Sequence, residues 1–178
     1  MRILYRVRQF WRTVFVKAGP LELEQVQAVL NPEQMALFIQ LQPGEKDHAV
    51  MMYHRLIEQG EIQPDLLVAA LLHDVGKLRY RQNPLERTMV VLFKAANPGQ
   101  ARKWGSLAPD AWEGLPGWRK PFIVAEQHAE WGAEMARQAG VSSLTETLIR
   151  EHHHLTSLGP GDEKDNLLHK LWVVDNDS

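Results

Sequence analysis

A histidine and an aspartate, His73 and Asp74, end a run of seven apolar residues at positions 66–72 and are followed directly by Val-Gly-Lys. The apolar run is typical of a buried helix. An imidazole and a carboxylate buried unpaired at its end would cost on the order of several kcal/mol, unless a metal ion or hydrogen-bond partners compensate. A metal site is the simplest interpretation of this pair.

Four further polar residues lie on apolar helical stripes, where core side chains are expected. They are His48, His128, His152 and Asp175. Apolar residues stand one and two turns from each of them, as Val124 and Met135 do beside His128. A single inward histidine is often a hydrogen-bonded core residue. Four helices that each present a ligand-type residue to the interior instead favour a shared metal site.

The order of these six residues resembles that of the HD-domain superfamily of metal-dependent phosphohydrolases, in its members that hold two metals. The run His-Asp-Val-Gly-Lys at positions 73–77 carries the resemblance, with Gly132-Ala133 after His128 and Ile-Arg-Glu-His-His at positions 149–153. The match extends from about Lys46 to Asp175. It implies an all-α fold, a single-domain helical bundle with a metal site in its core.

The resemblance also implies two ligand sets that share a bridging Asp74. One metal would be held by His48, His73, Asp74 and Asp175, and the other by His128 and His152. His153 is left open as an additional ligand. Neighbouring helical residues point about 100° apart, so His152 and His153 enter one site only if their helix ends there.

Two divalent transition-metal ions are therefore expected. Imidazole and carboxylate ligands without thiolates suit iron, manganese, nickel or zinc, and ligand type alone does not choose among them. The resemblance favours iron or manganese, and magnesium is a further candidate. The implied reaction is hydrolysis of a phosphoester or phosphoanhydride, with a nucleotide as the favoured substrate. The attacking group would be a metal-bridging hydroxide, since coordination lowers the pKa of water from about 15.7 to about 7.

Lys77 is the second catalytic candidate beside Asp74. By resemblance it would contact a phosphate oxygen or support the leaving group. The alternative is an exposed lysine near a helix C-terminus, a position that favours cations in any case.

The same residues bear on the other branches of the superfamily. The cyclic-dinucleotide phosphodiesterases carry Gly-Tyr-Pro after their paired histidines, whereas this chain continues Leu-Thr-Ser from position 155, so that activity is not assigned. The mononuclear nucleotidase type would leave His128 and His152 unexplained. A mixed-valence di-iron oxygenase has the same ligand pattern and stays an alternative, as does a non-catalytic module. Compactness and ligand order favour hydrolysis of dinucleoside tetraphosphates.

The chain has 178 residues and no cysteine, which fits one domain without disulfides or thiolate ligands and suits the cytoplasm. We expect helices in residues 1–44 to pack on a metal-binding core, residues 45–178.

The first twenty residues are basic and apolar. Charges interrupt every apolar run there, so a packed helix is favoured over a signal peptide or a membrane-surface helix. No nucleic acid partner and no stable membrane span are expected, and the oligomeric state is open.

Helical spacing predicts an almost entirely helical chain. The expected helices cover about 2–17, 21–30, 32–41, 45–59, 64–75, 84–96, 120–139, 142–154 and 163–175. Prolines 32, 64 and 121 suit first turns, and glycines 60, 76 and 140 suit C-terminal caps. Residues 97–121 are rich in proline and glycine, which predicts a loop-rich insert. Its tryptophans and basic residues either hold an anionic, aromatic substrate or anchor the loop on the core.

Overall fold

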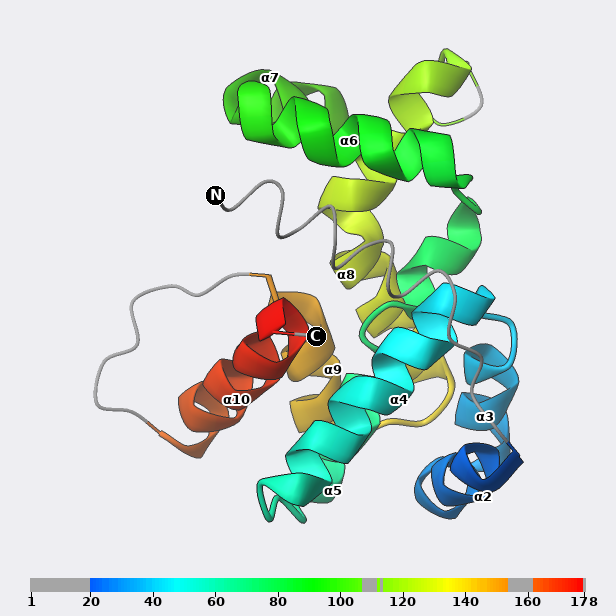
Figure 1. Ribbon diagram of the computed structural model, residues 1–178, viewed down its shortest axis with the longest axis vertical. Coiled ribbons are helices and arrows are strands. Elements are labelled where there is room, and N and C mark those ends of the chain that lie inside the picture. Colours follow the sequence, from blue (N-terminus) through cyan, green and yellow to red (C-terminus); the bar gives the residue numbers. More distant parts are fainter. Residues whose placement is uncertain (1–19, 107–111, 113, 154–161, 178) are drawn as a thin grey trace.

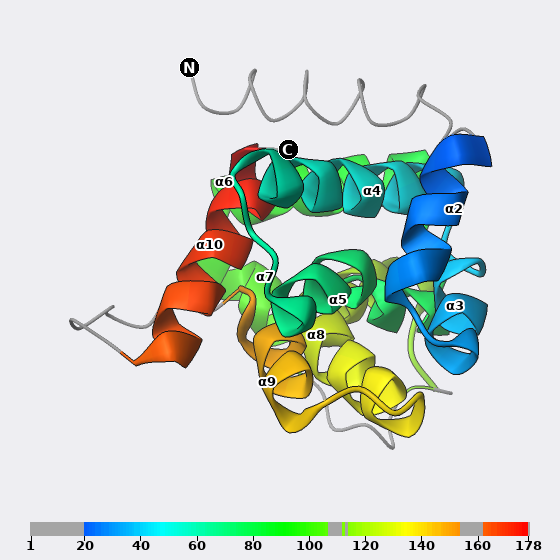
Figure 2. The same ribbon diagram turned by 90° about the horizontal axis from the view of Figure 1, so that it is seen from below.

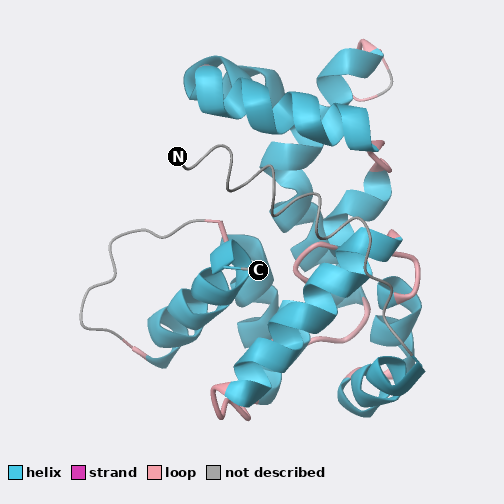
Figure 3. Cartoon of the chain, in the orientation of Figure 1, coloured by secondary structure: helices cyan, strands magenta, loops and turns pink. Residues whose placement is uncertain are grey.

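The structure is a computed structural model that describes residues 20–106, 112, 114–153 and 162–177. The helix expected over residues 2–17 lies outside the described residues. Within them the chain forms helices joined by loops, without a strand (Figure 3). The predicted all-α class is therefore confirmed.

Nine α-helices and two short 3-10 helices make up the described part of the chain. They are α2 (Pro20–Val29), α3 (Pro32–Phe38), α4 (Pro43–Glu58), α5 (Pro64–Leu72), η1 (Val75–Arg79), α6 (Pro84–Ala96), α7 (Pro98–Gly105), η3 (Gly117–Arg119), α8 (Lys120–Gln138), α9 (Ser143–Glu151) and α10 (Glu163–Asp177). None of the described helices is long and apolar enough to cross a membrane.

Five of the six predicted start and stop signals stand at helix ends. Pro32, Pro64 and Pro121 stand in the first turns of α3, α5 and α8. Gly60 and Gly140 end α4 and α8 with φ of 79° and 75°, a left-handed conformation that glycine adopts without steric cost.

Helix α5 is the centre of the fold. Leu66, Leu71 and Leu72 have no exposed surface, and Val68 is the only residue after the first turn that is not buried. It lies between α4 on one side and α9 on the other (Figure 2), and it also contacts α2, α3 and α10. A helix held so completely fixes the direction of its C-terminal end, where the His-Asp pair follows.

Helix α8 is the second main support, because it packs against η1, α7 and α9. Helices α6 and α7 lie together at one end of the molecule (Figure 1) and contact α8 there. A small apolar cluster joins them: Val90 of α6, Ala101 of α7 and Phe122 of α8 are buried against one another. Trp104 stacks on Phe93 in the same cluster, with ring centroids 4.4 Å apart.

The expected loop-rich insert was wrong for its first part. Residues 98–105 form α7, with Pro98 in the first turn and the Asn97 side chain accepting from the Gln100 backbone N–H as N-cap. Gly105 does not break the helix; a Cβ there would come within 2.7 Å of the Phe122 carbonyl oxygen of α8. Its role is close packing, and Trp104 anchors the segment on the core as the simpler interpretation held.

The prediction for the end of α5 was also wrong in detail. The helix ends at Leu72, and His73 is its C-cap rather than an interior residue. Gly76 is not a C-terminal cap with positive φ but part of η1. A Cβ on Gly76 would lie 1.9 Å from the His128 carbonyl oxygen and 2.7 Å from the Gly132 backbone nitrogen. The glycine is therefore needed for the close approach of η1 to α8.

Candidate metal centre

The first cluster of ligand-type side chains combines α4 with the end of α5. His48 comes from the middle of α4, while His73 and Asp74 leave α5 at its buried C-terminus. One ligand atom from each of these three residues lies within 4.8 Å of the others. Asp175 of α10 completes the group, because its Oδ1 lies 2.9 Å from Nε2 of His48 and 3.8 Å from Nε2 of His73.

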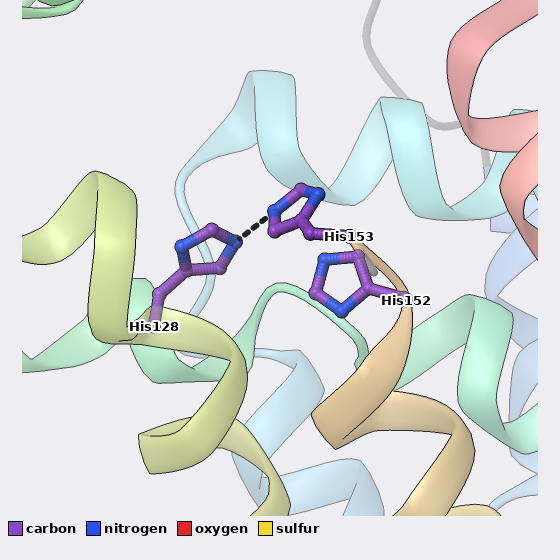
Figure 4. A group of neighbouring side chains, drawn as sticks. All are labelled: His128, His152 and His153. Carbon is purple, nitrogen blue, oxygen red and sulfur yellow. Dashed lines mark hydrogen bonds between the residues drawn. The ribbon is translucent and has the colours of Figure 1, made fainter. Parts of the chain in front are cut away.

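The second cluster consists of three histidines, His128, His152 and His153 (Figure 4). Their ligand nitrogens also lie within 4.8 Å of one another. His128 projects from α8, and the other two follow the last residue of α9. Nε2 of His153 lies 2.9 Å from Nε2 of His128, so these two nitrogens converge on one point. Helix α9 ends at Glu151 with His152 as its C-cap, and the ligand nitrogens of His152 and His153 both lie within the group formed with His128.

Asp74 stands between the two clusters. Its Oδ2 lies 3.6 Å from Nε2 of His73, and its Oδ1 lies 3.5 Å from Nε2 of His128. Both distances exceed those of hydrogen bonds. The two carboxylate oxygens thus face different clusters, an arrangement that suits a carboxylate shared by two cations. The structure brings all six predicted residues, and His153, into one region.

Backbone carbonyls set the tautomer of three of these histidines. Nδ1 of His73 donates to the Ala70 carbonyl oxygen at 2.9 Å, Nδ1 of His128 to that of Val124 at 2.8 Å, and Nδ1 of His152 to that of Ile149 at 2.6 Å. A carbonyl oxygen only accepts, so the proton of each neutral ring sits on Nδ1. Nε2 then presents a lone pair to the site, the form that binds a metal.

Burial keeps the histidines of the second cluster neutral. It lowers the pKa of His128 well below the ordinary value, and the nearby Lys77 ammonium lowers that pKa further. Burial and the neighbouring His153 lower the pKa of His152 to about 3. Burial also lowers the pKa of His153 to about 4. Protons therefore compete poorly with a metal ion for these nitrogens at neutral pH.

The carboxylates of the site stay ionised because neighbouring groups outweigh the effect of burial on their pKa. Burial by itself would raise the pKa of Asp74, but Lys77 and His73 hold it well below the usual range. Nζ of Lys77 lies 2.6 Å from Oδ2 of Asp74. The pKa of Asp175 is likewise lowered against the effect of burial, chiefly by its hydrogen bond from His48. Ionised carboxylates and neutral imidazoles together form a donor set for a hard-to-borderline divalent cation.

One buried atom, Nε2 of His152, shows most directly that these side chains could bind a metal ion. Nε2 of His152 is fully buried and has no hydrogen-bond partner among the described residues. A buried polar atom without a partner costs roughly 1–3 kcal/mol. Its lone pair faces the group formed with His128 and His153 (Figure 4), where a cation would satisfy it. The residues present fit a metal ion.

The packing role of two glycines, Gly76 and Gly132, was not predicted from the sequence. Gly76 and Gly132 let η1 pack directly on α8, with the Gly132 Cβ position only 3.2 Å from the Gly76 backbone nitrogen. This contact brings Asp74, just before η1, close to His128 on α8. The glycines are visible in the sequence, but their contact depends on the packing of two segments more than fifty residues apart.

A helical domain whose core gathers histidines and aspartates from five helices defines a class of metal-binding, all-α proteins. The sequence model of the HD domain family matches residues 46–176. The chain therefore belongs to the HD domain family, whose superfamily consists of metal-dependent phosphohydrolases. Comparison with curated proteins and with solved structures gave no match.

Proposed function

We propose that the protein is a phosphohydrolase that uses two divalent transition-metal ions. His48, His73, Asp74 and Asp175 would hold one ion. His128, His152 and Asp74 would hold the other, with His153 as an additional ligand. The observation that carries the proposal is the placement of Asp74, whose two oxygens face different histidine clusters at 3.6 and 3.5 Å.

The chain's own residues prepare this site for a phosphorylated substrate. The Nδ1 bonds to carbonyl oxygens fix the rings of His73, His128 and His152 with their Nε2 lone pairs inward. Two ions bound there would activate water and neutralise phosphate oxygens as Lewis acids. Two divalent cations and only two carboxylates leave the centre positive, which favours an anionic substrate and its transition state.

Lys77 supplies a side-chain positive charge beside the site. Its ammonium pairs with Asp74 at 2.6 Å, while its side chain is 27 % exposed and therefore within reach of a ligand entering from solvent. We assign it to a phosphate oxygen or to the leaving group of the substrate. A nucleotide carrying a phosphoester or phosphoanhydride is the substrate class favoured by the family resemblance.

The test is elemental analysis of protein purified without oxygen and without chelator, followed by assays of phosphate release from a panel of nucleotides. We expect about two ions per chain and metal-dependent release of phosphate. Asp74→Ala should remove the shared ligand, lower the content of both ions and abolish turnover, while circular dichroism stays helical.

His128→Ala separates the two-metal proposal from its rivals. It should reduce the content toward one ion, because it removes a ligand of the second cluster only. One ion per wild-type chain, unchanged in His128→Ala, would contradict the binuclear site and favour the mononuclear nucleotidase type. Oxygen uptake without phosphate release would contradict the hydrolase assignment and favour the di-iron oxygenase.

A further inference from the structure

Helices α5 and α9 form a matched parallel pair. Each has nine residues, and each has a histidine as its C-cap, His73 and His152. The two rings lie side by side at the far end, with centroids 5.1 Å apart. Their near ends are also adjacent, because Asp65 in the first turn of α5 is bonded to Ser142 and Thr145 at the start of α9. The helices therefore run in the same direction, with both ends in contact.

The link at the near end is a specific hydrogen-bond cluster, the Asp65 cluster, made of Asp65, Ser142 and Thr145. Oδ1 of Asp65 accepts from the Thr145 hydroxyl at 2.7 Å and from the Ser142 hydroxyl. Ser142 is also the N-cap of α9 and accepts from the Thr145 backbone N–H at 3.0 Å. On the α5 side, Gln63 donates to Oδ2 of Asp65 at 3.2 Å. One carboxylate is thus fixed by groups of both helices.

The negative charge of the Asp65 carboxylate is favourable at its position. It lies at the N-termini of two helices, where the helix dipoles favour an anion. Burial alone would raise the pKa of Asp65, but the hydrogen bonds from Ser142 and Thr145 lower it, so the group is ionised at neutral pH. Thr145 is only 2 % exposed, which strengthens its bond to a charged partner.

The far ends show why this link concerns the metal centre. His73 and His152 have similar cap conformations, with φ of −54° and −57°. In each, Nδ1 bonds the carbonyl oxygen three residues earlier. The ring position is thus tied to the end of its own helix. Nine helical residues span about 13 Å, and a helix transmits a shift along its axis over that length without bending.

We infer that the Asp65 cluster is a positioning device: it fixes the register of α9 against α5, and so the spacing of His152 and His153 from His73 and Asp74. The inference rests on the proposed two-metal function. None of the three residues touches the site itself. Loss of the cluster would let α9 shift along α5, and the ion held by His128, His152 and His153 would lose affinity first, because α9 supplies two of its ligands.

The test compares two identical substitutions in one helix. Thr145→Val removes the buried hydroxyl that donates to Asp65. Thr147→Val, two residues later in α9, removes only a local bond to the Ser143 carbonyl oxygen. Each purified variant is titrated with Co²⁺, whose visible absorption reports the geometry of its ligands, and circular dichroism confirms the helical fold.

For Thr145→Val we expect one of the two Co²⁺ ions to bind roughly tenfold more weakly, with an altered spectrum, because partners that orient ligands typically contribute tenfold or more to metal affinity. Thr145→Ser keeps the hydroxyl and should restore both affinity and spectrum. Thr147→Val should match the wild type. If Thr145→Val does not fold, Asp65→Asn is titrated in its place against the same control.

Two Co²⁺ ions bound with wild-type affinity and spectrum by Thr145→Val would overturn the inference and leave the proposed function standing. A uniform loss of both ions in Thr145→Val and Thr147→Val alike would also overturn it, as general destabilisation of α9. A wild-type chain that binds no Co²⁺ would refute the proposed function itself, and the inference with it. The three failures are thus distinguishable.

Discussion

At the scale of single residues, the geometry of three of the histidines, His73, His128 and His152, is set by main-chain atoms of the protein. A neutral imidazole can carry its proton on either nitrogen, and only one tautomer leaves Nε2 free for an ion. Nδ1 of His128 donates to the Val124 carbonyl oxygen one turn earlier in α8. His73 and His152 do the same at the ends of their helices. The orientation of the ligands is thus built from main-chain atoms.

Lys77 provides the residue-scale prediction. Its ammonium is the nearest positive charge to Asp74, at 2.6 Å, and it is assigned to the substrate phosphate. We expect Lys77→Met to keep two ions per chain and to lower kcat by roughly 10²–10³, the usual effect of removing one group that stabilises transition-state charge. Steady-state kinetics beside elemental analysis measures both quantities.

Arg79→Met is the matched control, because Arg79 is an exposed cation two residues further along, stacked on Trp131 at 5.0 Å. It should keep a kcat near that of the wild type. Equal losses in the two variants would mean that general positive charge, and not the position of Lys77, supports turnover. Loss of metal from Lys77→Met would assign the lysine to the stability of the site instead.

The sequence predicted which polar residues gather in the core, because these residue types were out of place on apolar stripes. It left His153 open for a physical reason: whether two adjacent histidines face one site depends on where the helix ends. The structure ends α9 at Glu151, with His152 as its C-cap. The helix end and the contacts of α9 with α5 and α8 together place both rings beside His128, an outcome that the spacing in the sequence does not contain.

At the scale of elements, the contact between η1 and α8 sets the distance between the two clusters. Gly76 lies where a Cβ would be 1.9 Å from the His128 carbonyl oxygen, so η1 and α8 touch backbone to backbone. Asp74 is the residue directly before η1, so the position of η1 determines where Asp74 lies. A larger residue at position 76 would separate Asp74 from His128, whose facing atoms are 3.5 Å apart.

We expect Gly76→Ala to destabilise the fold by roughly 1–3 kcal/mol, as overpacking of a close contact does, and to lower the metal content of what remains folded. Denaturant unfolding and elemental analysis are the measurements. Gly99→Ala is the control, since no atom lies within 4 Å of a Cβ at that helical position. Alanine there should be neutral or slightly stabilising. Equal effects of the two substitutions would contradict the conclusion that Gly76 is needed for the close contact between η1 and α8.

Glycine also explains where the prediction of elements failed. Gly105 and Gly76 were interpreted by local rules, as a breaker and as a cap, whereas both are glycine because another helix lies against them. A Cβ on Gly60 would meet no atom within 4 Å, and one on Gly140 would make only an ordinary contact with the Asn31 side chain at 3.8 Å. These two glycines followed the local rule and end their helices with positive φ. Local propensity therefore predicted helix existence well and failed where tertiary contact decided the residue.

At the scale of the whole molecule, formation of the site affects the stability of the fold, because folding buries ionisable side chains at an electrostatic cost. The proposed ligands lie on or directly after α4, α5, α8, α9 and α10, so the folded core must bury several ionisable side chains together. Without a cation, folding holds His128 and His152 neutral, with pKa values below the ordinary one. In the unfolded chain the same histidines return to their ordinary pKa, near 6.5.

The pH dependence of stability follows with a definite sign. As the pH falls below about 6.5, the unfolded chain takes up protons on these histidines while the folded, metal-free chain does not. The free energy of unfolding of the metal-free protein should therefore decrease between about pH 7 and pH 5, by roughly 1.4 kcal/mol per pH unit for each such histidine. Denaturant unfolding at a series of pH values, after chelation and removal of the chelator, measures the slope.

Replacement of one histidine isolates its share of that slope. His152 is only 1 % exposed, and its pKa of about 3 leaves it neutral throughout the range. His152→Gln should therefore reduce the pH dependence of the free energy of unfolding by the contribution of one proton, because the unfolded variant no longer takes up that proton. His169→Gln, which changes an exposed histidine of α10 outside the site, is the control. A slope that stays the same in His152→Gln would mean that His152 is protonated in the folded chain, and the neutral, metal-ready state of the second cluster would have to be abandoned.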